Sequence, residues 1–254
     1  MRALPQRRWF QELGRGLVST ALFLVAWYLV ASVANSRLAP GPVQVWREAV
    51  DLWLDGTLLH NLWITVARVT ASFVLAMLVG VALGIILAKF RSVDWLLGPW
   101  LTVGLNLPAL VLIVLTFVWM GLNEAATIIA VAANKIPTVA VIVRAGARSV
   151  DPALMDVARA FDLPRLRTFR RIYAPQLYPY LLAAARTGLA LVWKIVLVAE
   201  LIGRSDGIGF EIAVRFQQFD IAGILAFSFA FILVVAVLEV GVFQMLDVRM
   251  RRWR

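Results

Sequence analysis

Six long apolar runs follow one another along the chain, separated by polar segments. The runs cover residues 17–34, 62–88, 96–121, 125–146, 181–203 and 221–246. A bilayer core is crossed by about 20 consecutive apolar residues in a helix, so each run predicts one transmembrane helix. The second run is the longest, which predicts a helix that tilts or extends beyond the hydrocarbon. The pattern predicts an all-α integral membrane protein with six transmembrane helices, folded as one domain over residues 1–254.

A shorter amphipathic segment lies between the first two runs. Residues 39–42 read Ala-Pro-Gly-Pro, which predicts a turn. In residues 43–54 an apolar set recurs at helical spacing, and Arg47, Glu48 and Asp51 take the other face. The apolar set consists of Trp46, Ala49, Val50, Trp53 and Leu54. Such a helix is suited to the outer membrane interface.

The second run carries a small residue at every fourth position, namely Ala76, Gly80, Gly84 and Ala88. Small residues at this spacing let two helices approach closely in lipid. The stripe predicts close packing, either within this chain or against a second copy of it.

The composition supports the membrane interpretation and excludes several kinds of site. Apolar residues make up 62% of the chain and charged residues 16%, against about 45–50% and 25% in soluble proteins. The chain has no cysteine, which excludes disulfides, thiol catalysis and thiolate metal sites. His60 is the single histidine, so a multi-histidine metal site is excluded as well. The sequence shows no nucleophile–base or metal constellation, so we expect no catalytic site in this chain.

The positions of the 25 Lys and Arg residues predict the orientation in the membrane. If the N-terminus is inside, most of them fall on the cytoplasmic side, in both tails and in the loops after the second and fourth runs. The tails contribute Arg2, Arg7, Arg8, Arg15, Arg249, Arg251, Arg252 and Arg254. The opposite side receives only Arg37, Arg47, Arg204 and Arg215. Such a bias predicts that both termini are cytoplasmic. The net charge of +10 then reflects orientation and not a nucleic-acid partner.

The start of the chain has a second interpretation. Arg7-Arg8 before the first apolar run resembles a twin-arginine signal, and residues 32–34 resemble a small-residue cleavage site. The run is long enough to span a bilayer, which favours an uncleaved first helix.

The only long cytoplasmic loop covers residues 149–179, and two short helices are predicted in it. Asp151 can cap the first helix, with Pro152 at its first position. Asp162 can cap the second helix, which Leu163 and Pro164 would open. Four apolar residues of the first helix share one face, at positions i, i+3, i+4 and i+7: Leu154, Val157, Ala158 and Phe161. This face either packs on the chain's own bundle or docks into a groove of a partner.

Ionisable and helix-breaking residues within the runs are candidates for a translocation pathway. Lys135 and Lys194 lie near the middle of their runs and either attract an anion or pair with Glu200 or Glu239. The third and fourth runs are interrupted by Pro108 and Pro137. Each proline is either a packing kink or part of a pathway lining. The candidate pathway residues are Asn106, Pro108, Lys135, Lys194 and Glu200. Arg68 and Arg186 lie nearer the ends of their runs, where an arginine can extend to the interface.

The long loop resembles the permease signature of bacterial binding-protein-dependent ABC importers, of the nitrate, sulfonate and taurine type. That signature is Glu-Ala-Ala, then Gly, nine residues, Ile or Val, and Pro soon after. Here Asp156 takes the Glu position, Asp162 takes the Gly position, and Ile172 and Pro175 follow at the expected spacing. Asp162 is the larger departure, because Gly adopts a left-handed turn without steric cost. Four further segments are similar to this family: residues 38–42, 149–152, 199–202 and 207–209.

The resemblance implies a type I ABC importer-like permease fold in the bacterial inner membrane. It also implies a homodimer that forms the pathway and a periplasmic or lipid-anchored substrate-binding protein. Two cytoplasmic ATPase subunits would carry ATP and Mg, since this chain has no GxxxxGK[ST] loop and binds no cofactor of its own. The coupling helix would comprise Leu154, Met155, Asp156, Val157, Ala158, Arg159, Phe161, Asp162, Leu163, Pro164 and Arg165. The substrate implied is a small anion such as a sulfonate, nitrate or carboxylate.

Membrane lipid is a further expected partner. The alternative is a stand-alone secondary transporter or channel. Many secondary transporters contain inverted repeats, and this sequence shows none. ATP dependence of uptake separates the two interpretations. A membrane enzyme is a more distant third interpretation.

Overall fold

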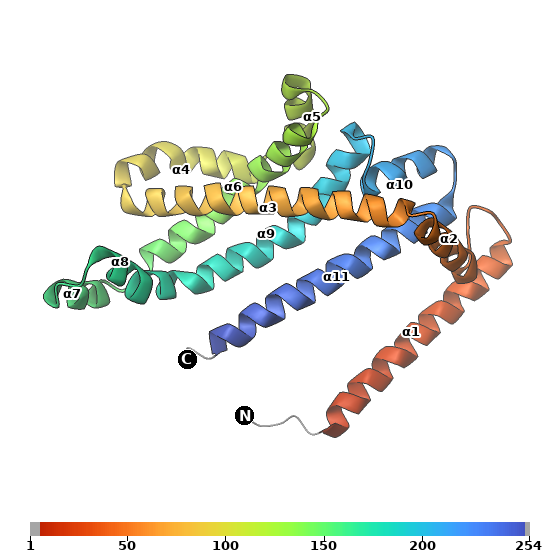
Figure 1. Ribbon diagram of the computed structural model, residues 1–254, viewed down its shortest axis with the longest axis horizontal. Coiled ribbons are helices and arrows are strands. Elements are labelled where there is room, and N and C mark those ends of the chain that lie inside the picture. Colours follow the sequence, from red (N-terminus) through yellow and green to blue (C-terminus); the bar gives the residue numbers. More distant parts are fainter. Residues whose placement is uncertain (1–5, 252–254) are drawn as a thin grey trace.

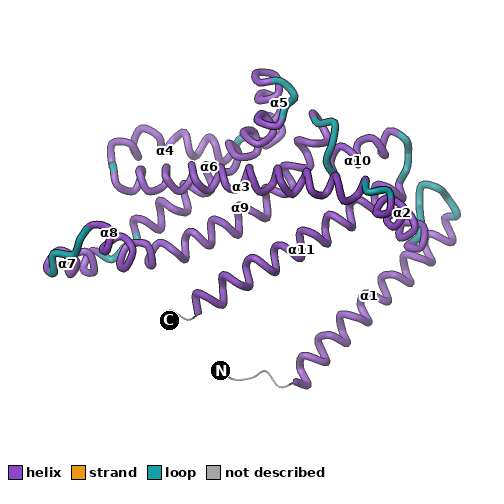
Figure 2. Tube along the Cα trace, viewed as in Figure 1, coloured by secondary structure: helices purple, strands orange, loops and turns teal. Residues whose placement is uncertain are grey.

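The computed structural model describes residues 6–251 as helices joined by short connections (Figures 1 and 2). The side chains of residues 6–13, 17, 240 and 242–251 are not described, and Arg2, Arg252 and Arg254 lie outside the described residues. The elements are α1 (Gln6–Ala34), α2 (Pro42–Leu54), α3 (Thr57–Lys89), α4 (Arg91–Asn106), α5 (Ala109–Met120), α6 (Glu124–Arg148), α7 (Pro152–Ala160), α8 (Arg165–Thr168), the π-helix η1 (Phe169–Tyr173), α9 (Ala174–Gly203), α10 (Ile208–Gln217) and α11 (Ile221–Arg251).

Five described helices are long and apolar enough to cross a membrane. They are residues 14–34 of α1, α3, α6, the continuous segment 165–203 and residues 221–239 of α11. The third predicted span, residues 96–121, is not one straight helix. It is divided into α4 and α5, which meet at an angle of 102° and count as a sixth span only when taken together.

The break between α4 and α5 has a local cause at Pro108. The proline disfavours helical geometry for the residue before it, and Leu107 is extended at φ −70° and ψ 124°. The side-chain amide of Asn134 donates a hydrogen bond of 3.3 Å to the carbonyl oxygen of Leu107. Pro137 behaves differently, since it lies within α6 and the helix continues past it. The expected interruption at residues 136–137 is therefore not a break in the helix.

The centre of the bundle is formed by α3, α6 and α9, and α6 packs against both of the others. Gly80 and Gly84 of α3 are buried against α6. A Cβ atom at Gly80 would lie 2.6 Å from Cβ of Val139, and one at Gly84 would lie 2.7 Å from the carbonyl oxygen of Ala140. Of the two interpretations of the small-residue stripe, packing within the chain is the one that the structure shows.

The helix α1 stands apart from the bundle over most of its length, and α2 connects it to the rest (Figure 1). Its main anchor is Trp27, whose ring lies 5.7 Å from the ring of Phe229 in α11. The indole N–H of Trp27 donates to the carbonyl oxygen of Pro40 at 3.0 Å. The amphipathic helix α2 buries Val45 and Leu52 and leaves Trp46, Trp53 and Leu54 of its expected apolar set exposed.

The loops after the second and fourth apolar runs lie at the same end of the bundle. The junction of α3 and α4, the end of α6, and the segment α7–α8 all lie at one end of the bundle, on the left of Figure 1. Lys89, Arg91 and Arg148 belong to this end. The α2 helix, the α5–α6 junction and α10 lie at the other end. We call these the basic end and the opposite end.

Gly84→Ala is expected to destabilise the fold, because the new Cβ would press on a backbone atom of α6. Overpacking of this kind costs about 1–3 kcal/mol, or about 2–12 °C in melting temperature. Gly98→Ala is the matched control, since its Cβ would come no closer than 3.7 Å to Arg144. Melting in detergent, followed by fluorescence-detected size exclusion, measures both. Equal melting temperatures for the two variants would show that the α3–α6 approach is not tight.

Candidate functional site

The helix α7 begins where the sequence predicts. Asp151 is its N-cap, and a carboxylate oxygen accepts a hydrogen bond of 2.8 Å from the backbone N–H of Ala153. Pro152 occupies the first helical position, where its missing N–H has no cost. The short helix therefore has a defined start at the basic end of the bundle.

The turn after α7 differs from the prediction. Asp162 does not cap the second helix, because it adopts the left-handed conformation at φ +44°. The N–H of Leu163 donates to the carbonyl oxygen of Ala158 at 3.0 Å, and the N–H of Asp162 donates to that of Arg159 at 3.1 Å. This pair of bonds is a Schellman motif, whose left-handed position is usually glycine. Asp162 thus performs the turn that the family signature assigns to Gly.

The second part of the loop is also more helical than expected. Pro164, and not Asp162, is the N-cap of α8. The π-helix η1 follows directly and continues into α9. The fifth span therefore begins well before residue 181, and the loop predicted over residues 149–179 is shorter than its sequence indicated.

The two faces of α7 have different surroundings. Ala158 is only 3% exposed and faces the chain's own bundle. Leu154, Val157 and Phe161 are 45%, 48% and 74% exposed. We call these three residues the α7 apolar face. Of the four apolar residues predicted to share a face, three are therefore open to a partner and Ala158 is not.

A cavity of about 850 Å³ lies between α7 and the bundle. The ends of α3 and α6 form one side of it, and residues between 155 and 173 form the other. Six residues predicted for the coupling helix line this cavity: Met155, Ala158, Arg159, Asp162, Leu163 and Arg165. We call it the α7 cavity.

The two lysines within the membrane have no acidic partner in the described part of the chain. Lys135 of α6 is 6% exposed, and none of the described ion pairs includes its ammonium group. Lys194 is exposed on α9. The pairing of these lysines with Glu200 or Glu239, one of the two interpretations of the sequence, is not present among the described ion pairs.

The remaining pathway candidates lie in different places. Asn106 and Pro108 are exposed at the bend between α4 and α5. Glu200 is 0% exposed, and its carboxylate is part of a buried polar network. The structure therefore does not gather the five candidates in one place.

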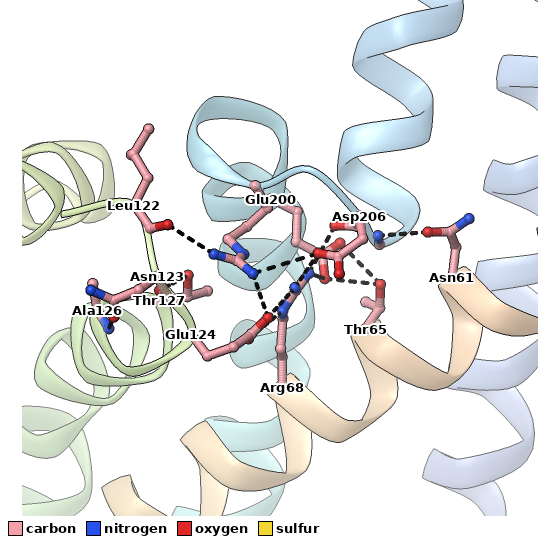
Figure 3. A network of polar contacts seen from close by, with 12 residues as sticks. Asn61, Thr65, Arg68, Leu122, Asn123, Glu124, Ala126, Thr127, Glu200 and Asp206 are labelled. Atoms are coloured by element: carbon pink, nitrogen blue, oxygen red, sulfur yellow. Dashed lines mark hydrogen bonds and ion pairs between the residues drawn. The ribbon is translucent and has the colours of Figure 1, made fainter.

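The buried network is centred on Arg68, which uses all five of its N–H donors (Figure 3). Its Nε and Nη2 donate to the two carboxylate oxygens of Glu124, at 2.8 and 2.6 Å. Its Nη1 donates to Glu200 and to the backbone carbonyl of Asp206, both at 2.9 Å. Nη2 also contacts the Asp206 carboxylate. Arg68 is 2% exposed, so the expectation that it extends to the interface is wrong.

Glu200 has a structural task within this network. Besides Arg68, its carboxylate accepts hydrogen bonds of 2.9 Å from the hydroxyl of Thr65 and from the backbone N–H of Gly209. The same hydroxyl accepts from the N–H of Ile208 at 2.9 Å. The N–H groups of Ile208 and Gly209 belong to the first turn of α10. The first N–H groups of a helix have no acceptor within that helix. Residues of α3 and α9 therefore cap α10.

The glycines of the 207–209 segment are required by this arrangement. Gly207 has φ +99°, and a Cβ there would lie 2.5 Å from the Glu200 side chain. A Cβ at Gly209 would lie 2.3 Å from the carbonyl oxygen of Leu197. Residues 199–202 and 207–209 are both similar to the permease family. This similarity was the one sequence signal that pointed to the network.

The network extends to α6 through Glu124, which is half-exposed. Arg204 contacts the same carboxylate of Glu124 that Arg68 holds, and its Nη1 donates to the carbonyl oxygen of Leu122 at 3.1 Å. Three membrane-spanning helices and the α9–α10 connection are thus joined at the opposite end. No group of three or more potential metal ligands occurs in the described part of the chain.

Arg68→Met is expected to destabilise the protein strongly, because Glu200 would remain buried without its cation. Breaking a buried pair costs about 3–5 kcal/mol, or about 6–20 °C in melting temperature. Arg144→Met is the control: Arg144 is part-exposed at the basic end, and Asp94 keeps Arg148 at 2.6 Å. The control should cost about 0–1 kcal/mol. Similar melting of both variants would contradict a central role for Arg68.

Curated relatives match nearly the whole chain. A probable ABC transporter permease protein of Brucella abortus is 29% identical over 245 residues, covering 95% of this chain and 96% of the relative. The taurine transport system permease protein of Escherichia coli is 26% identical and covers 92% and 87%. The nitrate import permease protein of Synechocystis is 28% identical and covers 78% and 75%.

Solved structures share the fold. A bacterial ABC transporter for import of the acidic polysaccharide alginate aligns with a TM-score of 0.64 at 14% identity, covering 96% of this chain and 99% of that one. A methionine ABC transporter in an inward-facing conformation aligns at 0.62 and 16% identity, covering 74% and 94%. The fold is that of type I ABC importer permeases. The family of binding-protein-dependent transport system inner membrane components matches residues 80–254. The chain therefore belongs to this family of non-catalytic, multi-pass permease subunits of ABC transporters.

Proposed function

We propose that two copies of this chain form the translocation pathway of an ATP-driven importer for a small anion. In this proposal both termini are cytoplasmic, so the basic end faces the cytoplasm. Two ATPase subunits, which carry ATP and Mg, bind at α7. A periplasmic or lipid-anchored binding protein delivers the substrate at the opposite end. The observation that carries the proposal is the exposed α7 apolar face at the basic end.

The α7 apolar face suits a partner and not lipid or water. Two large apolar side chains of α7 and that of its C-cap residue, Phe161, are exposed together, which is the usual mark of a docking surface. The capped start at Asp151 and the Schellman turn at Asp162 hold the helix as a rigid unit. A rigid helix can pass a movement of the ATPases to the bundle, because packed interfaces switch between discrete arrangements.

The exposed face of α9 supports pairing of two copies. Ala183, Thr187, Ala190 and Lys194 are exposed on α9 at helical spacing. A lysine in contact with lipid near the bilayer centre costs about 2.5–3.5 kcal/mol or more. A second copy or a water-lined pathway on this face removes that cost. The small residues of the same stripe permit close approach of another helix.

The two lysines also support an anionic substrate. Lys135 lies eleven residues from the start of α6, about 16 Å along the helix, and is thus near its middle. A buried ammonium group without an acidic partner attracts a carboxylate, sulfonate or nitrate group. The permeases for taurine and nitrate are relatives of this chain, and both compounds carry such groups.

Val157→Arg is expected to release the ATPase, because it places a charge in the middle of the α7 apolar face. Loss of one buried apolar side chain weakens binding by about tenfold or more. The complex is purified from its native membrane, and the ratio of ATPase to permease is measured by mass spectrometry. Ala158→Arg is a poorer test, since Ala158 is buried at the α7 cavity and is not part of the α7 apolar face.

The matched control is Val43→Arg on α2, because Val43 is 51% exposed and Val157 is 48% exposed. The control should keep its ATPase and its ATP-dependent uptake. Recovery of the permease alone, with uptake that persists without ATP, would favour a secondary transporter. Retention of the ATPase by Val157→Arg would contradict docking at α7.

Lys194→Met is expected to reduce uptake by about tenfold or more while the complex still assembles, since one cation–anion contact is lost. Lys135→Met should act in the same direction. Arg91→Met, at the start of α4, removes one positive charge away from the membrane centre and serves as the control. Uptake of radiolabelled taurine and nitrate by proteoliposomes measures the effect. Unchanged uptake with both central variants would exclude them from the pathway.

A further inference from the structure

The α7 cavity is lined by Met155, Ala158 and Arg159 of α7, and the α7 apolar face is not part of its lining. Ile85, Ala88 and Lys89 from the end of α3 and Ala147 from the end of α6 form its bundle side. A partner bound to Leu154, Val157 and Phe161 therefore leaves the cavity unfilled. Its volume of about 850 Å³ is within the range of ordinary ligand sites, about 300–1,000 Å³.

The lining has two chemical parts. One part is apolar, with side chains such as Ile85, Met155 and Phe169. The other part is cationic, and its members are Lys89, Arg159 and Arg165, against a single acidic residue, Asp162. The cavity can therefore receive a molecule with an apolar portion and an anionic group.

Two of the three cations that line the cavity are in no described ion pair. Within residues 6–251, neither Lys89 nor Arg165 makes an ion pair with a described side chain, and Lys89 only stacks over the ring of Phe90 at 5.3 Å. Arg159 pairs with Asp156 at the surface. A bound anion would supply the counter-charge that the chain itself does not provide.

The depth of the cavity in the membrane narrows the class of ligand. Lys89 is the last residue of the spanning helix α3, and η1 leads directly into the spanning helix α9. The cavity therefore lies at the level where the apolar core gives way to headgroups. Basic pockets of this kind on the cytoplasmic side recognise anionic headgroups.

We propose that the α7 cavity binds an anionic phospholipid of the cytoplasmic leaflet. The phosphate lies between Lys89 and Arg165, and the glycerol and upper acyl carbons lie against Ile85 and Phe169. The bound lipid fills the space behind α7 and supports this helix while its other face carries the ATPase. The assignment to the cytoplasmic leaflet rests on the orientation given in the proposed function.

A free phosphate compound carries the same anionic group, but it has no apolar portion to contact the apolar part of the lining. A headgroup at the interface gains from both parts of the lining, which is why the lipid is the source we assign. The distinction is measurable, because inorganic phosphate competes only if the cationic part alone determines binding.

The test uses the complex purified from its native membrane and washed in detergent, with retained phosphatidylglycerol counted by native mass spectrometry. Lys89→Gln with Arg165→Gln is the cavity variant. Arg167→Gln with Arg171→Gln is the control, with the same change in charge on residues that do not line the cavity. The cavity variant should retain at least about tenfold less lipid than the wild type, because each interfacial cation contributes several-fold to binding. The control should retain lipid as the wild type does.

A second variant separates loss of the site from loss of the fold. Ala88→Phe fills the cavity and leaves its charges in place, so it should also lose the lipid while the melting temperature changes little. Equal retention in all variants, or equal loss in the cavity variant and the control, would overturn the proposal. Displacement of the lipid by millimolar inorganic phosphate would assign the site to a soluble anion instead. The ratio of ATPase to permease in the same spectra reports separately on the proposed function.

Discussion

One buried guanidinium group fixes the relative positions of three membrane-spanning helices. Arg68 would be very costly in this environment if any of its N–H groups lacked a partner. All five have one, and the partners come from α6, from α9 and from the connection to α10. Glu200 is in turn satisfied by α3 and by the first turn of α10. The opposite end of the bundle is therefore defined by mutual satisfaction of polar groups, and no member can move alone without leaving another unpaired.

The basic half of the bundle is held by a different means. There α3 and α6 approach closely because Gly84 presents no side chain to Ala140, and α6 and α9 meet where Gly146 faces Tyr180. Lipid gives helices no hydrophobic reason to associate, so such contact depends on shape. Asp94, held by Arg144 and Arg148, adds a polar tie between α4 and α6. One end is thus specified by hydrogen bonds and the other mainly by fit.

The sequence allowed the local features to be predicted and left the distant ones open. Apolar runs located the spans, arginines gave a consistent charge asymmetry, and Asp151-Pro152 marked the start of α7, because each of these depends on neighbouring residues. The 102° bend at Pro108 was expected only as an interruption, since its angle depends on packing. Asp162 was assigned to a cap because its side chain favours one, whereas the left-handed turn is imposed by the Schellman bonds. Arg68 was misplaced because Glu200 lies 132 positions away.

The spacing of the Arg68 network along the chain also bears on how the protein is made. Asp206 is 138 positions after Arg68, and ribosomes add about 5–20 residues per second. The interval between synthesis of Arg68 and synthesis of Asp206, its last partner, is therefore roughly 7–28 seconds. An isolated arginine in a helix costs about 2.5–3.5 kcal/mol on the insertion scale, and the apolar length of α3 has to outweigh this cost in the interim. Glu124 is synthesised first and can hold the arginine until α9 enters the membrane.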